Sequence, residues 1–174
     1  LYSRQMVELK ENATKDFFKG LKLCGFESNK IPQIKAVNGN LIKATGWRTY
    51  VVPGLIADKP FFQYLANRRF PVTTWIRKKN ELEYLEEPDM FHDVFGHIPL
   101  LINPTFSKFA QAFGKLGQQF KGDIEMLEKL QRIYWFTIEF GLIKEEGKTK
   151  VYGAGIASSY GETNHVFDPK IVHS

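Results

Sequence analysis

The sequence predicts an α+β fold that is mostly helical, with small sheet elements and a metal held in a cleft between helices. Apolar residues recur three and four positions apart through much of the chain, a pattern typical of amphipathic helices. Runs rich in β-branched and aromatic residues are few and short, so only small strands are expected. Two histidines near the middle of the chain and one carboxylate within an apolar run indicate the metal site.

The length and composition are those of a globular protein. At 174 residues, of which 43% are hydrophobic, the chain can form one domain with a substantial core. We expect one domain over residues 1–174, truncated at both ends, because the first residue is not Met and the tail stops without an obvious end. The single cysteine, Cys24, excludes an intramolecular disulfide framework and favours a reducing cytoplasm.

The charge pattern argues against nucleic acid and membrane partners. The net charge is +5, but basic residues are spread along the chain and mixed with acidic ones. The densest basic cluster, Arg77-Lys78-Lys79, is short, so no nucleic-acid surface is expected. The chain shows neither a signal-peptide pattern nor a run of about 18 apolar residues, so no membrane span is expected.

The N-terminal third is predicted to be helical. A helical pattern opens the sequence and runs to Gly25, a typical stop signal. Ile31-Pro32 begins a second helix, where a missing proline N–H is harmless, and Gly46 ends it.

The next part mixes short strands with one helix. Residues 47–52 predict a strand, and Pro53-Gly54 predicts the turn after it. A helix is expected to begin at residues 58–60 and to reach Asn67. Residues 72–77 read as a second strand, with a short return strand over 82–85.

The C-terminal half contains two longer helices and a hairpin. Asn103-Pro104 opens one helix, and the glycines at 114, 117 and 122 indicate a looser region after it. Asp123 is a good N-cap for the next helix. A hairpin is predicted over 144–152, around Glu146-Gly147, followed by irregular backbone and a helix that begins near Ser158.

Residues 87–99, Glu-Pro-Asp-Met-Phe-His-Asp-Val-Phe-Gly-His-Ile-Pro, contain His92 and His97. Five residues turn an ideal α-helix by roughly 500°, which leaves the two rings about 140° apart. This is not the spacing of zinc peptidases, whose histidines lie four residues apart. Gly96 and Pro99 are helix-ending signals, so we expect His92 to project from a helix and His97 from its unwinding end.

Glu139 is the best third ligand. It interrupts residues 134–142, the most apolar run in the chain, and a bare buried carboxylate is very costly unless it is paired or bound to metal. Trp135 lies one helical turn before it. Two histidines and one carboxylate with open coordination positions form the ligand set of non-haem Fe(II) oxygenases, so His92, His97 and Glu139 are predicted metal ligands.

Other polar residues suggest further hypotheses. Arg77 is either a surface charge or a guanidinium that faces a pocket, where it could bind a substrate carboxylate through two N–H groups. Gly153-Ala154-Gly155 is too sparse for a dinucleotide fingerprint. Ser158, with Glu162 and His165 nearby, matches no nucleophile elbow.

Three segments in this order, 87–99, 134–142 and 152–159, resemble the pterin-dependent aromatic amino acid hydroxylases, and among them the bacterial phenylalanine 4-hydroxylases. The likeness extends upstream through 45–56 and 65–73 and covers nearly the whole chain. It implies the catalytic-domain fold of that family. It also implies a monooxygenase that uses Fe(II), tetrahydrobiopterin and O₂ to hydroxylate L-phenylalanine to L-tyrosine.

The resemblance also assigns roles to individual residues. It gives His92, His97 and Glu139 as the iron ligands. The residues implied for the amino acid substrate are Arg77, Pro88, Trp135, Phe140, Gly155 and Ser158. Those implied for the pterin are Gly54, Leu55, Ile56, Phe61 and Asp93. Leu85 stands where the animal enzymes carry a threonine that helps to bind the substrate. No regulatory domain or tetramerisation helix is expected, which favours a monomer.

Several alternatives stay open at this point. The same family also hydroxylates tyrosine and tryptophan, and the discriminating residues are not evident in this sequence. A non-catalytic metal-binding module could retain the fold without turnover. A zinc hydrolase is a further alternative, against which the spacing of His92 and His97 counts.

Overall fold

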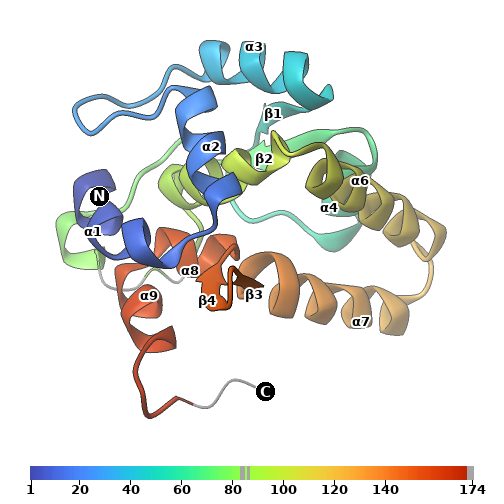
Figure 1. The fold of residues 1–174 in the computed structure, drawn as a ribbon. Coiled ribbons are helices and arrows are strands. Elements are labelled where there is room, and N and C mark those ends of the chain that lie inside the picture. The colour runs from blue at the N-terminus through green and yellow to red at the C-terminus, as the bar shows by residue number, and fades with distance from the viewer. Residues whose placement is uncertain (83–84, 86, 172–174) are drawn as a thin grey trace.

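The computed structural model describes residues 1–82, 85 and 87–171. Helices dominate this part of the chain and the strands are short, as predicted (Figure 1). The first half contains α1 (Tyr2–Asn12), α2 (Lys15–Cys24), α3 (Ile34–Thr45), β1 (Arg48–Val51), α4 (Asp58–Ala66), β2 (Arg69–Val72) and the 3₁₀ helix η1 (Lys79–Glu81). Then follow the π-helix η2 (Phe91–His97), α5 (Ile98–Leu101), α6 (Pro104–Gln119), α7 (Ile124–Tyr134), the π-helix η3 (Trp135–Glu139), β3 (Leu142–Glu145), β4 (Lys148–Val151), α8 (Ala154–Ser158) and α9 (Tyr160–Val166).

The N-terminal helical pattern is divided between α1 and α2. The division falls at Thr14, whose backbone is extended and whose hydroxyl accepts a hydrogen bond from the N–H of Phe17 at 3.3 Å. This is an N-cap, which starts a new helix although the apolar spacing continues across it. Gly25 and Gly46 end α2 and α3 in the left-handed conformation, as predicted. However, α3 begins at Ile34, later than the expected Ile31-Pro32 start.

The strands β1 and β2 pair in parallel, with Arg48 opposite Arg69 and Val51 opposite Val72. The prediction of a strand over 72–77 was therefore wrong, because the ladder beside β1 is formed by the preceding residues and ends at Val72. The return strand expected over 82–85 includes residues 83 and 84, which lie outside the described residues.

The second sheet is the predicted hairpin of β3 and β4, in which Leu142 pairs with Val151 and Glu145 with Lys148. Its two-residue turn consists of Glu146 and Gly147, which have φ angles of 51° and 78°. Both residues are left-handed, as this type of hairpin turn requires.

The helices α4 and α6 pack closely through glycines. A Cβ atom on Gly114 would lie 2.3 Å from the backbone nitrogen of Ala66, and one on Gly117 would lie 2.2 Å from the ring of Phe62. Both glycines belong to α6. The prediction of a looser region at 114 and 117 was wrong, since these glycines permit a close helix–helix approach.

The core has two apolar clusters, and η2 runs between them. Val94 of η2 belongs with Ile98 of α5 to the cluster that includes Trp47, whereas Phe95 of η2 belongs to the cluster that includes Phe17. On the side of Phe17, η2 also packs against α8. Side chains on η2 are therefore held from two sides. None of the helices formed by the described residues is long and apolar enough to cross a membrane.

Candidate active site

The π-helix η2 brings His92 and His97 onto one face. In a π-helix each N–H bonds to the carbonyl five residues earlier, so residues five positions apart lie over each other. The predicted unwinding at Gly96 was wrong, since the chain continues from η2 into α5 without a break. Gly96 instead allows η2 to approach α8, because a Cβ there would lie 2.9 Å from the carbonyl oxygen of Ala154.

Glu139 is the last residue of η3, which continues α7. Asp123 caps the start of α7 as predicted, with its side chain accepting from the N–H of Met126 at 3.0 Å. The apolar run around Glu139 is only partly buried. Tyr134 and Ile138 face the core, whereas Trp135 and Phe136 are 55% and 72% exposed. The side chain of Glu139 itself is 12% exposed.

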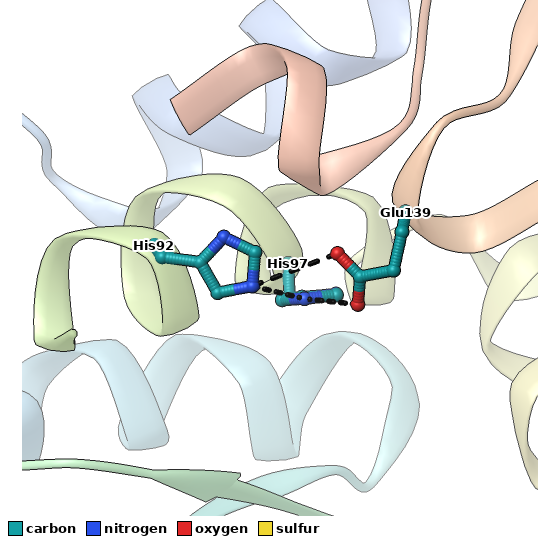
Figure 2. A group of neighbouring side chains, drawn as sticks. All are labelled: His92, His97 and Glu139. Atoms are coloured by element: carbon teal, nitrogen blue, oxygen red, sulfur yellow. Dashed lines mark hydrogen bonds and ion pairs between the residues drawn. The ribbon is translucent and has the colours of Figure 1, made fainter. Parts of the chain in front are cut away.

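The three predicted ligands converge on one point (Figure 2). Nε2 of His92 and Nε2 of His97 are 3.1 Å apart. Nε2 of His97 lies 3.0 Å from one oxygen of Glu139, and Nε2 of His92 lies 3.6 Å from the other. Phe70 packs against the His97 ring, with ring centroids 4.6 Å apart, and holds it in place.

Ser158 fixes the proton on His92. The Ser158 hydroxyl oxygen lies 2.8 Å from Nδ1 of His92 and donates to the carbonyl oxygen of Ala154 at 2.8 Å. Because a hydroxyl has one proton, Ser158 must accept the N–H of His92 Nδ1. The other nitrogen, Nε2, then presents a lone pair to His97 and Glu139, as a metal ligand must.

The electrostatics of the site favour a bound cation. Burial lowers the pKa of His92 to about 4, so the ring is neutral at pH 7, although the nearby Glu139 carboxylate opposes this shift. Burial alone would raise the pKa of Glu139, but the His97 and His92 rings bring it below its usual value. The site therefore offers an ionised carboxylate and at least one neutral imidazole.

The donor set fits a divalent transition metal. Donors at about 2.1 Å from one ion lie roughly 3.0–3.4 Å from each other when they are adjacent in its coordination sphere. The separations of 3.1 and 3.0 Å lie in this range, and the separation of 3.6 Å, which involves the other oxygen of Glu139, lies just above it. Two imidazoles and one carboxylate form a facial set that leaves other positions open.

The predicted metal site opens into a cavity of about 870 Å³. Most residues predicted for the substrate or the pterin line it: Leu55, Ile56, Phe61, Arg77, Pro88, Trp135, Phe140, Gly155 and Ser158. Leu85 lines it as well. The rings of Trp135 and Phe140 pack against each other, with centroids 4.7 Å apart, and form one wall.

Two of the predicted residues do not line the cavity. Gly54 lies in the loop before Leu55 and is not among the lining residues. Asp93 is buried, and its carboxylate accepts from the N–H and hydroxyl of Thr73 at 2.7 and 2.8 Å. Burial raises the pKa of Asp93 to about 6, against the effect of these hydrogen bonds.

Arg77 is paired with Asp89, a residue that the sequence analysis did not single out. The guanidinium binds the carboxylate through Nη2 and Nε at 2.8 and 2.9 Å, and its side chain is 2% exposed. The guanidinium also donates to the carbonyl oxygen of Ser158 at 3.1 Å, while Asp89 accepts from the N–H of His92 at 2.9 Å. The position of Asp89, three residues before His92, is a capping signal that could have revealed it.

Comparison with known proteins gives a consistent result. A family model described as "Biopterin-dependent aromatic amino acid hydroxylase" matches residues 3–173. Phenylalanine-4-hydroxylase of Chromobacterium violaceum is 47% identical over 168 residues, which are 97% of this chain and 56% of the relative. The chain thus spans little more than half the length of this relative.

Solved structures of the Chromobacterium violaceum enzyme share the fold. The structure with iron(III) and 7,8-dihydrobiopterin has a TM-score of 0.91 and 47% identity, over 96% of this chain and 61% of that one. The structure with iron and phenylalanine has a TM-score of 0.89 and 44% identity, over 97% and 60%. This chain belongs to the biopterin-dependent aromatic amino acid hydroxylase family.

Proposed function

We propose that the protein containing this chain hydroxylates the aromatic ring of L-phenylalanine to give L-tyrosine, using Fe(II), tetrahydrobiopterin and O₂. The observation that carries the proposal is the convergence of His92, His97 and Glu139 at the wall of a large cavity lined by aromatic rings. At about 870 Å³, the cavity is in the upper part of the usual range for ligand sites and can take an amino acid and a pterin together. The names of the relatives support the same substrate.

His92, His97 and Glu139 would hold the iron. When bound, iron and the reduced pterin supply the activation of O₂ and the two electrons that the reaction requires. The residues of the chain have the tasks of holding these groups, orienting the substrate and keeping water away. Ser158 contributes to the first task by keeping the Nδ1 proton of His92 away from the metal-facing nitrogen.

Arg77 would bind the carboxylate of the amino acid. Three of its five N–H groups are engaged by Asp89 and by the Ser158 carbonyl, and two have no partner among the described residues. Because the ion pair with Asp89 fixes the guanidinium, the remaining N–H groups point in a constant direction. A substrate held at its carboxylate end presents its ring to the metal site, which is the orientation effect.

Trp135 and Phe140 would form the wall for the substrate ring, together with Pro88 and Gly155. Gly155 leaves space there, since a Cβ would lie 3.3 Å from the ring of Phe140. An apolar wall beside the metal excludes water from the reacting atoms. Leu55, Ile56 and Phe61 lie along the same cavity and would hold the flat pterin, with Phe61 available for stacking.

The decisive test is product analysis. The full-length protein would be loaded with Fe(II) without oxygen, then given tetrahydrobiopterin, O₂ and an equimolar mixture of phenylalanine, tyrosine and tryptophan. Tyrosine formed from labelled phenylalanine as the main product supports the proposal. Hydroxylation chiefly of another ring would transfer the assignment to another activity of the family. Absence of any product with iron bound would favour a non-catalytic metal-binding module.

We also propose that the protein is a monomer in the cytoplasm. The single cysteine, Cys24, is a buried thiol, which suits a reducing compartment. Light scattering of the full-length protein would test the monomer, and a dimer mass would contradict it.

A further inference from the structure

We propose that Glu162 binds the α-ammonium group of the amino acid substrate and thereby selects ligands that carry a free amino group. The inference rests on the proposed function, since it concerns the same cavity and an amino acid ligand. Glu162 lies in the first turn of α9 and lines the cavity with Ser158 and Ser159.

Glu162 differs from the other carboxylates that line the cavity. Glu139 is engaged by His92 and His97, and Asp58 accepts a hydrogen bond from the side chain of Gln131. In the part of the chain that the structure describes, no group donates to the carboxylate of Glu162, which is half-buried. A partly buried carboxylate without a donor is available to a ligand.

The position of Glu162 places it at the Arg77 end of the cavity. Arg77 donates to the carbonyl oxygen of Ser158 at 3.1 Å, and Ser159 accepts from the N–H of Glu162 at 3.3 Å. The N–H of Glu162 is therefore bonded to the residue next to Ser158, and Arg77 contacts the carbonyl of Ser158. Asp58 lies on another element, the helix α4 that also carries Phe61.

Buried hydrogen bonds fix the position of the segment that carries Glu162. Thr163 is fully buried, and its hydroxyl oxygen lies 2.7 and 2.9 Å from the carbonyl oxygens of Ile156 and Ser159. Gln5 of α1 donates to the Thr163 hydroxyl at 2.7 Å and is itself 3% exposed. This network connects α1, α8 and α9, so the backbone at Glu162 has a fixed position relative to Ser158.

The charges at this end match an amino acid. At pH 7 the ligand carries a carboxylate and an ammonium group on the same carbon atom. The charge of Arg77 is balanced by Asp89, and the carboxylate of Glu162 adds a negative charge on the segment next to Ser158, which Arg77 contacts. An ammonium group that leaves water needs an anionic or strongly accepting partner. Glu162 supplies that partner, while the unused N–H groups of Arg77 serve the carboxylate.

A structural role for Glu162 makes a different prediction. An acidic residue in the first turn of a helix also interacts favourably with the helix N–H groups. Such a role would affect the stability of α9 but would not distinguish between ligands with and without an amino group. The test therefore compares two ligands on the same variant.

Calorimetry on the full-length, Fe(II)-loaded protein without oxygen provides the comparison, with L-phenylalanine and 3-phenylpropionate as ligands. The two ligands differ only in the amino group. We expect Glu162→Gln to weaken L-phenylalanine binding by about 10–100-fold, the size typical of a charge-assisted hydrogen bond. Binding of 3-phenylpropionate should be unchanged or tighter, because a repulsive carboxylate has been removed.

Asp58→Asn is the matched control, since it removes one negative charge from the same cavity but from another element, the helix α4. It should leave the ratio of the two affinities unchanged. Glu162→Asp retains the charge with a shorter reach and should give a smaller loss that is again confined to L-phenylalanine. This variant decides the question if Glu162→Gln does not fold, as judged by circular dichroism.

The outcomes separate this inference from the proposed function. If the wild type prefers L-phenylalanine and Glu162→Gln retains that preference, the role of Glu162 is overturned and the proposed function stands. If Asp58→Asn reduces the preference as much as Glu162→Gln does, the effect is long-range and the assignment to Glu162 is overturned. If the wild type binds L-phenylalanine no better than 3-phenylpropionate, ammonium recognition is overturned, and no binding of either ligand contradicts the proposed function as well.

Discussion

The hydroxyl oxygen of Ser158 lies 2.8 Å from Nδ1 of His92, and this contact connects α8 to the ring of a predicted metal ligand. The same hydroxyl donates to Ala154, so its role as an acceptor toward His92 is fixed. The family resemblance implies that Ser158 contacts the substrate. The structure gives it a second task, in which it determines which nitrogen of His92 carries the proton.

Replacing Ser158 by alanine should weaken metal binding. Without the hydroxyl, the Nδ1 proton of His92 loses its acceptor, and partners of this kind typically contribute 10–100-fold to metal affinity. Titration with Co(II) against a competing chelator, with no amino acid present, would measure the change. Ser107→Ala, which also removes a buried serine hydroxyl but in α6, should bind Co(II) as the wild type does. Equal affinities for both variants would contradict the role of Ser158.

Replacing Glu139 by alanine should abolish both iron retention and turnover. The variant keeps two imidazole nitrogens but loses the ionised carboxylate, the only charged member of the predicted ligand set. Iron content after gel filtration, determined by elemental analysis, gives the readout. Glu128→Ala, at an exposed position on α7, serves as the control. A Glu139→Ala protein that retained stoichiometric iron and activity would remove Glu139 from the ligand set.

The Arg77–Asp89 pair should be important for stability. Asp89→Asn would leave a guanidinium that is 2% exposed without its counter-charge, and breaking a buried pair in this way costs about 3–5 kcal/mol. Urea denaturation would measure the change in the free energy of unfolding. The exposed pair of Lys129 and Glu125 is the comparison, and Glu125→Gln should cost less than about 1 kcal/mol. Similar losses of unfolding free energy in Asp89→Asn and Glu125→Gln would contradict the larger contribution expected of the buried Arg77–Asp89 pair.

Two glycine-to-alanine variants in helices should have opposite effects. Gly114→Ala places a methyl group 2.3 Å from the backbone of α4, so we expect a loss of about 1–3 kcal/mol from overpacking. Gly39→Ala meets no atom within 4 Å in α3, and should stabilise by about 0.5–1 kcal/mol through helix propensity. Thermal unfolding of both proteins tests the pair. Stabilisation by Gly114→Ala would contradict the close packing of α4 and α6.

The thiol of Cys24 should be unreactive in the folded protein. Burial raises its pKa to about 12, so it stays protonated at pH 8.5, where an ordinary cysteine would be about half ionised. We expect iodoacetamide to label Cys24 slowly in buffer and rapidly in 6 M urea, as followed by mass spectrometry. Rapid labelling of the native protein at pH 8.5 would show that the thiol is accessible.

The sequence was informative wherever local chemistry determines the structure. The caps at Asp123 and Asn103 and the left-handed glycines at 25 and 46 were predicted correctly because each acts on its own backbone neighbours. His92, His97 and Glu139 could be proposed as ligands because a carboxylate in an apolar run requires a partner. The structure brings these three side chains together as predicted.

The features that the sequence did not reveal depend on tertiary contacts or on unusual hydrogen bonding. Gly114 and Gly117 suggested a loose segment because their contacts with α4 involve residues about 50 positions away. The second strand was misplaced because its position depends on which residues pair with β1. The π-helix over 91–97 was missed because a helix is recognised in sequence by apolar residues that recur about every 3.6 positions. No local sequence signal indicated a helix with more residues per turn.

The wider turn of η2 has a consequence for how such sites evolve and are found. Histidines five apart in a π-helix occupy the same relative position as histidines four apart in an α-helix, with one residue added between them. Insertion or deletion of a single codon can therefore change the spacing of the motif while both rings keep a common face. Searches for metal sites that accept only spacings of three or four will overlook sites built in this way, although their chemistry is the same.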